Sequence, residues 1–266
     1  QGFSLVELMI AITIGLLIIA ATLSIFFSNK QTYIASDNIS RVQESSRTAF
    51  ELINRDVRES TGTLCDFGIV PISVLNNSAG FMWRNWTNPI MGFDNGALGG
   101  SLAGTDAIEI KTAGTSQFDV TLHTPGTNSF ALNTTHPLDP ITNNIIPIVT
   151  GDILIACDFN RAAIFQVSGV AGSVVSHAAG GTTPGNSIAN LGALGASYRF
   201  VDHATLSRIN TTQWFVAANG RGGNSLFRNT LRTNAGVPAM VREEVAEGVR
   251  DLQITYLLRA GTAYIN

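Results

Sequence analysis

The chain has 266 residues, of which 45% are hydrophobic and only 13% are charged, and its formal net charge is −3. Sixteen Lys and Arg against 19 Asp and Glu leave no basic excess, which argues against a nucleic-acid-binding protein. Apolar residues are too abundant for a disordered chain, and a mean hydropathy of +0.21 indicates that one membrane segment raises the average.

The first element is an apolar segment from Leu8 to Asn29, which contains no charged residue and lies between Glu7 and Lys30. About 20 apolar residues span the hydrocarbon core of a bilayer as a helix. The stretch is too long for a secretory signal peptide, and no small-residue cleavage site follows it. A membrane-spanning helix is therefore predicted, and a plain single-span anchor is the simplest interpretation.

Glu7 does not fit a plain anchor, because it lies inside the apolar stretch between Val6 and Leu8. A carboxylate costs about 2.5–3.5 kcal/mol at the centre of a span and less near its edge. An ionisable residue in such a segment is a functional hypothesis by default.

The first ten residues combine a Gly, a Phe, three further residues, a Glu and the start of a long apolar helix. This pattern resembles the processing site of type IV pilins and type II secretion pseudopilins. The resemblance implies that a prepilin peptidase cuts between Gly2 and Phe3, and that Phe3 is then N-methylated. It also implies that Glu7 pairs with the N-terminal amine of a neighbouring subunit, since a buried carboxylate is tolerable only when paired. Residues 1–2 would be the remnant of a leader.

The helix is predicted to continue beyond the span to Ser60. Apolar and small residues recur there at three- or four-residue spacing, on one helical face: Ile39, Val42, Ser46, Ala49, Ile53 and Val57. Charged residues occupy the other faces, no proline precedes Pro71, and Gly62 is a natural helix stop. We expect roughly 55 residues of helix, about 80 Å long. Its outer half should pack on the remaining domain, because an amphipathic stripe needs a partner.

Residues 61–266 are predicted to form one β-rich globular domain. Short β-rich runs alternate with turn clusters, which indicates antiparallel sheet with long loops. The predicted strands are Ala107–Thr112, Phe118–His123, Asp152–Cys157, Ala163–Val170, Ser197–Val201, Trp214–Ala217, Ser225–Arg228 and Leu252–Leu258. Surface loops are expected over Gly96–Gly104 and Val170–Gly195.

The predicted fold class is therefore α+β and type IV pilin-like. One long N-terminal α-helix has a transmembrane half over residues 3–29 and an amphipathic half over residues 30–60. It packs on the antiparallel β-sheet domain that follows.

Three later parts of the chain resemble the PilW-type minor pilins within this superfamily. Gly151–Cys157 together with Ala163–Val167 is similar to a strand pair of that branch, and Trp214–Arg228 is similar to its hairpin. Glu243–Tyr256 is similar to its late strand, in a pattern shared with the J-type pseudopilin. Because relatives generally continue with further strands, we expect the chain to be incomplete after Asn266.

Cys65 and Cys157 are the only cysteines. An even count outside the cytoplasm favours a disulfide, which would tie the end of the long helix to the sheet. Two unpaired buried thiols are the alternative. No metal site is predicted, because the four histidines are scattered without ligand spacing: His123, His136, His177 and His203.

The other patterns favour structural roles over chemistry. Gly185–Ala189 partly matches the G-x-S-x-G pattern of a nucleophile elbow, but it lacks the last Gly and the strand–turn–helix context. Asn219–Gly223 is predicted to be a hairpin loop that needs positive φ, and not a phosphate loop. Asp94–Gly96, Asp152 and Asp158 are predicted to lie in or cap turns, with ion binding as the alternative. The aromatic cluster of Phe81, Met82, Trp83 and Trp86 is predicted to pack in the core, with a partner surface as the alternative.

Three hypotheses for function follow. The first is a non-catalytic minor pilin that helps initiate or cap assembly of a type IV pilus. Its implied partners are other minor pilins, the major pilin, the prepilin peptidase, the pilus assembly platform and the inner membrane, with the globular domain in the periplasm and then in the extracellular pilus. The second is a J-type pseudopilin of a type II secretion system. The third, a membrane-anchored periplasmic binding protein or enzyme, has no supporting motif. No cofactor and no nucleic acid are expected.

Overall fold

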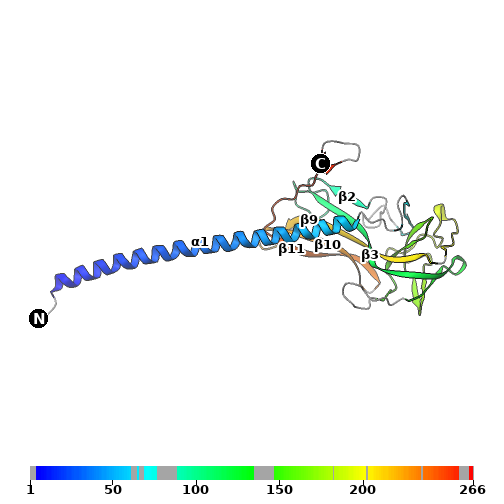
Figure 1. Ribbon diagram of the computed structural model, residues 1–266, viewed down its shortest axis with the longest axis horizontal. Coiled ribbons are helices and arrows are strands. Elements are labelled where there is room, and N and C mark those ends of the chain that lie inside the picture. The colour runs from blue at the N-terminus through cyan, green and yellow to red at the C-terminus, as the bar shows by residue number, and fades with distance from the viewer. Residues whose placement is uncertain are drawn as a thin grey trace. The chain divides into compact units, whose positions relative to one another are not determined.

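The computed structural model describes residues 4–60, 65, 69–76, 89–134, 147–181, 183–201, 203–234, 236–257 and 264–265. One long helix, α1 (Leu5–Ser60), precedes a mostly antiparallel β-sheet region, which confirms the predicted α+β, type IV pilin-like architecture (Figure 1). The chain divides into two compact units, Gln1–Thr48 and Ala49–Asn266. The predicted boundary after residue 60 marks the end of the helix, whereas the second compact unit already begins at Ala49.

Helix α1 contains 56 residues and ends at Ser60, as the periodicity predicted. Ala49 is only 5% exposed, and Ile53 and Val57 pack against the sheet behind it. The first half of the predicted stripe does not pack in this way, because Ile39 and Val42 are 59% and 54% exposed. Periodicity identified the apolar face correctly but could not identify what each part of that face contacts.

The sheet is built around two long antiparallel strands, β3 (Ala107–Thr124) and β9 (Thr205–Ala218). On one side of β9 lie β10 (Asn224–Asn234) and then the edge strand β11 (Val237–Glu247), while β2 (Ile90–Phe93) pairs with β3. Figure 1 shows the end of α1 crossing this group of strands, and it packs there through the apolar cluster around Trp214.

The remaining strands of the sheet join other parts of β9 and β3, directly or through a neighbouring strand. Next to the first part of β9 lie β5 (Ile153–Cys157), β6 (Ala162–Gln166) and the parallel β1 (Ile72–Ser73). The end of β3 continues into β4 (Ser129–Leu132), β8 (Val174–Ser176) and β7 (Gly169–Ala171). Two 3₁₀ turns, Pro125–Thr127 and Ala193–Gly195, and a separate pair, β12 (Tyr256–Leu257) and β13 (Tyr264–Ile265), complete the described elements.

Several predicted strands have different limits in the structure. The two runs Ala107–Thr112 and Phe118–His123 form one strand, because β9 pairs with both across an irregularity between Ala113 and Gln117. Ala163–Val170 is divided between β6 and β7, and Ser197–Val201 is not a strand. No predicted strand covers β1, β2, β4, β8, β13 or the first part of β11, whose last residues belong to the predicted late strand Glu243–Tyr256.

The segment Val170–Gly195 was predicted to be a surface loop, and this prediction was wrong. It contains the end of β7 and all of β8, and Val175, His177 and Leu191 are at most 1% exposed. These side chains join an aromatic core whose largest members are Phe118, Phe130, Phe165 and Phe200. A segment rich in Gly, Ser and Ala can fold inward when a few large apolar residues anchor it.

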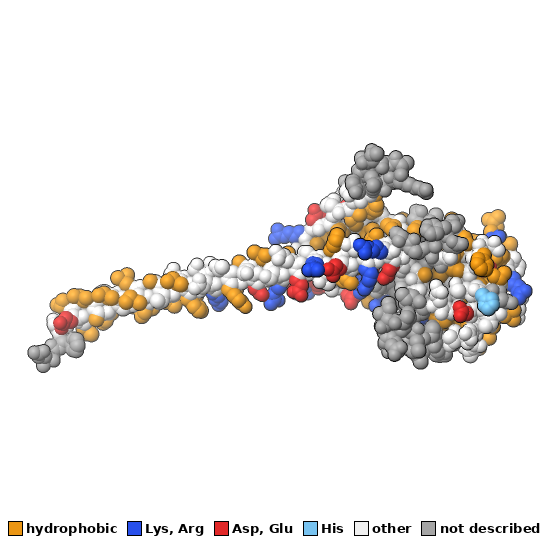
Figure 2. Space-filling model, viewed as in Figure 1, with side chains coloured by type: hydrophobic (Ala, Val, Ile, Leu, Met, Phe, Trp, Pro, Cys, Tyr) orange, Lys and Arg blue, Asp and Glu red, His pale blue; other side chains and the backbone are white. Residues whose placement is uncertain are grey.

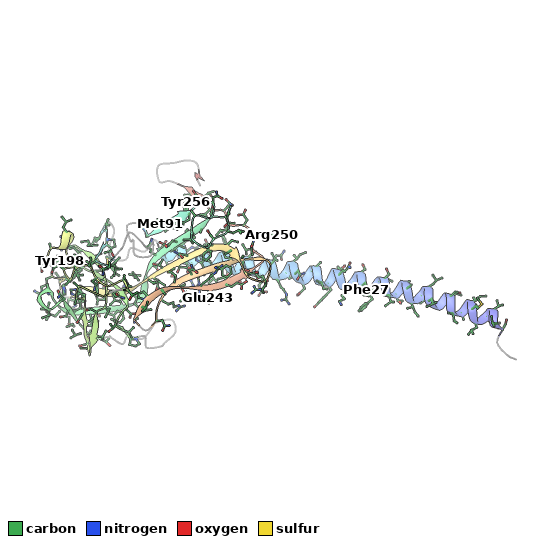
Figure 3. The ribbon with its side chains drawn as sticks, turned by 180° about the vertical axis from the view of Figure 1, so that it is seen from behind. Phe27, Met91, Tyr198, Glu243, Arg250 and Tyr256 are labelled. Carbon is green, nitrogen blue, oxygen red and sulfur yellow. A yellow bond between two sulfur atoms is a disulfide. The ribbon has the colours of Figure 1, made fainter. Side chains whose placement is uncertain are left out.

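In the described part of the predicted strand Leu252–Leu258, residues 252–255 form a strap without regular pairing and Tyr256–Leu257 is strand. The Asp106 N–H donates to Leu252 O (2.8 Å), and the Ile254 N–H donates to Asp106 Oδ2 (2.8 Å). Figure 3 shows Tyr256 beside Met91, and a Cβ on the neighbouring Gly92 would fall 2.0 Å from the Tyr256 hydroxyl. A side chain at position 92 would therefore displace the Tyr256 ring.

A fully buried ion pair lies on the face of β3 opposite α1. The side chains of Glu109 and Lys111 have no exposed surface, and Lys111 Nζ lies 2.6 Å from Glu109 Oε1. Gln213 Nε2 on β9 donates to Glu109 Oε2 at 2.7 Å, and Asn229 Nδ2 on β10 donates to Gln213 Oε1 at 3.1 Å. These contacts form a polar row across three adjacent strands.

Two histidines that are 54 residues apart in sequence meet in the aromatic core. The Nε2 atoms of His123 and His177 lie 3.1 Å apart. Because the Phe200 N–H donates to His123 Nδ1 (3.0 Å), the proton of a neutral His123 must lie on Nε2 and point at His177. His177 then accepts at Nε2 and donates from Nδ1 to Ala189 O at 3.0 Å. All four ring nitrogens are satisfied when both rings are neutral.

The histidine pair should make folding stability pH-dependent. Burial is the main cause that lowers the pKa of both His123 and His177 from 6.5 to about 4. Repulsion from the positive charges of His177 and Arg199 lowers the pKa of His123 further. Between pH 6.5 and 4 the unfolded chain therefore binds more protons than the folded chain, so the free energy of unfolding falls as the pH falls through this window. Urea denaturation at several pH values measures the slope. In His177→Gln the slope between pH 6.5 and 4 should be smaller, and an unchanged slope would contradict the assignment.

Candidate functional site

The start of α1 holds the acid that the sequence singled out. Ser4 O accepts the first helical hydrogen bond from the Leu8 N–H (3.2 Å), so Ser4 is the N-cap residue. The Ser4 N–H donates to Glu7 Oε2 at 3.0 Å, and the Val6 N–H donates to Ser4 Oγ at 3.4 Å. Glu7 therefore folds back over the first turn of its own helix. Gly2 and Phe3, the residues of the expected cut, lie outside the described residues.

The helix that follows Glu7 is apolar on every side. An 18-residue window of α1 has a mean hydropathy of 2.6, and none of that window is buried. Figure 2 shows hydrophobic side chains covering this stretch, with charged ones only further along α1. Figure 3 shows Phe27 projecting from the helix, where it is 58% exposed. By length and composition, α1 can span a membrane.

The comparisons with known proteins bear on this N-terminal segment. Residues 1–23 match the family model of the prokaryotic N-terminal methylation motif. No curated protein and no solved structure matches the chain. The motif and the apolar helix together are the arrangement of a membrane-anchored protein with a type IV pilin-like start.

The pilin-like helix is joined to the sheet by a buried polar contact. Trp214 Nε1 on β9 donates to Asp56 Oδ2 at 2.9 Å, and both residues are buried. Around this contact the apolar side of the helix packs on Ile110 and Leu226. Arg228 lies 5.7 Å from the centre of the Trp214 ring, on β10. The hydrogen bond fixes how the last turns of α1 sit on the sheet, because Trp has only one donor.

Replacing Trp214 with Phe should lower the free energy of unfolding by about 1–3 kcal/mol, because the buried Asp56 carboxylate loses a donor. Urea denaturation followed by circular dichroism measures the change. Asp56→Asn keeps an acceptor for the indole and should cost less. If Trp214→Phe leaves the midpoint unchanged, the contact does not hold the helix.

The two cysteines are joined in a disulfide, Cys65–Cys157, across 92 residues of sequence. Cys157 is the last residue of β5, and Cys65 lies five residues after the end of α1. Both pack in one apolar cluster with Ile155 and Ile164. The bond therefore ties the chain after the helix to a strand that pairs with β9.

The weaker sequence candidates have structural roles. Ser187 Oγ donates to Val74 O at 2.9 Å, in a loop segment between β8 and β9 where a nucleophile elbow would need a strand followed by a helix. Asn219 Oδ1 accepts from the Arg221 and Gly223 N–H groups, and Gly220 has φ +73°, so the predicted β9–β10 hairpin loop is confirmed. The aromatic cluster Phe81, Met82, Trp83 and Trp86 lies outside the described residues.

Asp158 and Asp152, the two aspartates that the sequence singled out, make contacts that stabilise the fold. Asp158 Oδ1 accepts from the N–H groups of Asn160 and Arg161, which is the predicted turn capping, and Oδ2 accepts from the Tyr198 hydroxyl at 2.7 Å. Asp152 also forms an ion pair that the sequence did not predict, in which Arg208 Nε and Nη2 both donate to the single oxygen Oδ2. In the described part of the chain, no group of three or more His, Cys, Asp or Glu is placed to hold a metal ion.

The sequence reading missed the contact between Ser4 and Glu7, although a signal for it was present. Ser followed three residues later by Glu, directly before an apolar run, is the pattern of a capping box.

Proposed function

We propose that this chain is a minor pilin that helps initiate or cap assembly of a type IV pilus. The observation that carries the proposal is the methylation motif at residues 1–23, placed at the start of an apolar helix whose side chains are exposed in the single chain. An apolar surface of this kind needs lipid before assembly and other helices after it. The β-sheet unit would then be the part that contacts other subunits outside the membrane.

The proposed assembly uses the N-terminal residues in sequence. A prepilin peptidase hydrolyses the peptide bond between Gly2 and Phe3, which leaves a new α-amine on Phe3 that is then methylated. In the filament, the Glu7 carboxylate pairs with the cationic amine of a neighbouring subunit. Pairing removes the cost of an uncompensated charge among apolar helices. The chain itself performs no catalytic step.

The PilW-type branch is supported by the blocks Gly151–Cys157, Trp214–Arg228 and Glu243–Tyr256. In the structure these blocks include β5, the β9–β10 hairpin, the end of β11 and the strap whose backbone bonds to Asp106. The proposed partners are other minor pilins, the major pilin, the prepilin peptidase and the assembly platform of the inner membrane. The alternative is a J-type pseudopilin of type II secretion, which shares the N-terminal motif and the pattern of Glu243–Tyr256.

Glu7→Ala is expected to reduce the amount of this chain in filaments by at least tenfold, because the neighbour's amine loses its counter-ion. Quantitative mass spectrometry of sheared surface filaments measures the incorporation. Glu44→Ala is a matched control, since Glu44 is an exposed acid on α1 outside the apolar stretch, and incorporation should stay within about twofold. Unchanged incorporation of Glu7→Ala would contradict the pairing of Glu7 with a neighbour's amine.

The N-terminal peptide of the native chain distinguishes the hypotheses. A peptide that begins at N-methylated Phe3 in the filament fraction would support the minor pilin. The same peptide in the envelope, absent from filaments, would favour a pseudopilus. A peptide that still carries Gly2 would contradict both assembly hypotheses.

A further inference from the structure

We infer that the two carboxylate oxygens of Glu7 have separate roles, with Oε2 capping the start of its own helix and Oε1 left to accept a cation. In this arrangement the backbone N–H of Ser4 is a positioning group for Glu7. The second half of the inference, pairing through Oε1, rests on the proposed function, whereas the cap is a property of the single chain.

The contacts at the helix start are those of a capping box. Ser4 accepts the first helical bond from Leu8, the Val6 N–H reaches Ser4 Oγ, and the Ser4 N–H reaches Glu7 Oε2. Glu7, the third helical residue, thus accepts from the backbone donor of the N-cap residue, and in this variant of the box the Ser4 hydroxyl accepts from the Val6 N–H. The spacing is set by the sequence, because Glu7 is three residues after Ser4.

A cap has unusual value at this position. The first four N–H groups of any helix have no helical partner, and an apolar segment in lipid offers them no water. Glu7 accepts a hydrogen bond from one of these donors, the Ser4 N–H, and its charge lies at the positive end of the helix dipole. The same contacts give the carboxylate a hydrogen bond and a favourable field within the single chain. An acid inside an apolar segment is therefore partly compensated before any neighbour arrives.

The cap leaves capacity for a partner. An ionised carboxylate has two oxygens and about four acceptor positions. Among the described residues, the only hydrogen bond of Glu7 is to Oε2, so Oε1 has no partner there. A neighbour's ammonium can then bind Oε1 while Ser4 keeps Oε2. Since the Ser4 contact restricts the rotamers of Glu7, Oε1 is held in one direction before the cation binds.

Amide exchange of Ser4 in the full chain, in detergent micelles, tests the cap. Labelling Phe carbonyls with ¹³C and Ser amides with ¹⁵N selects only Phe–Ser pairs, which occur in this sequence at Phe3–Ser4 and Phe27–Ser28. Ser28 lies in the middle of α1 and is an internal control. We expect Ser4 to exchange at least tenfold faster in Glu7→Leu, and at the native rate in Glu7→Gln, whose amide oxygen still accepts. Equal Ser4 exchange in the native chain and Glu7→Leu would overturn the cap.

The positioning role is tested by Glu7→Asp, which keeps the charge but is one methylene too short to reach the Ser4 N–H. We expect fast Ser4 exchange and at least threefold lower incorporation into filaments than the native chain. Native incorporation together with fast Ser4 exchange would overturn the positioning role. Glu7→Gln should keep the cap and lose incorporation. If it is incorporated normally while Ser4 remains protected, the charge pairing of the proposed function is wrong and the cap stands.

Discussion

Replacing Lys111 with Met is expected to lower the free energy of unfolding by about 3–5 kcal/mol. The Glu109 carboxylate would then be left in a fully buried site without its cation, 2.6 Å away in the native chain. Gln213 alone cannot compensate a full negative charge, because it supplies one neutral donor. Urea denaturation of the full chain in detergent, followed by the fluorescence of its tryptophans, measures the loss.

Two comparisons separate charge from packing. The double variant Glu109→Leu with Lys111→Met removes both charges and should recover most of the loss, because apolar replacement of a buried pair is often neutral. Arg221→Ala removes an exposed partner of Glu244 on the hairpin and should cost no more than about 1 kcal/mol. If Lys111→Met costs no more than Arg221→Ala, the buried pair is not important for stability.

Replacing Cys65 and Cys157 with Ser is expected to remove about 4–5 kcal/mol of stability. The bond closes 92 residues of sequence, and closure of so long a loop restricts the unfolded chain strongly. Chemical denaturation of the oxidised chain, the reduced chain and the double Ser variant measures the difference.

The reduced chain and the double Ser variant should agree within about 0.5 kcal/mol if the effect belongs to the bond. The Ser variant buries two hydroxyls in an apolar cluster, so a larger loss in that variant alone would show a packing effect. A midpoint that is the same in the oxidised and reduced chains would contradict the expectation.

The sequence predicted the elements whose signal is local. Helix α1 was predicted to its last residue because its apolar face repeats every three or four residues and no proline interrupts it. Strand β5, an apolar run followed by Cys157, was predicted within one residue. In both cases the periodicity or the apolar run lies within the element itself.

The elements that were missed depend on distant partners. Edge strand β11 carries Arg242, Glu243 and Glu244 in succession, which reads as an exposed segment, and its strand character comes from pairing with β10. The two predicted runs in β3 became one strand because β9 pairs with both. The meeting of His123 and His177 depends on the pairing of β3, β4 and β8, and no local pattern encodes it.

The candidate site was predictable in its chemistry but not in its geometry. The residue Glu7 and the apolar helix follow from composition and resemblance, and the match to the methylation motif supports that part. The use of Glu7 Oε2 by Ser4 follows from backbone placement in the first turn. The Asp56–Trp214 contact joins residues 158 apart, so the end of the helix could not be placed on β9 from sequence alone.

The disulfide determines how the protein would carry mechanical tension. A pull on α1 passes through Ser60 to Cys65, and there the covalent path divides. One branch crosses the sulfur bridge directly to Cys157 at the end of β5, while the other runs through the 92-residue loop that contains β1 to β5. The bridge is much shorter than the loop, so it becomes taut first and the strands in the loop are shielded from force. A subunit drawn by its helix would transmit the load to the strand beside β9 without unravelling the chain between the two cysteines.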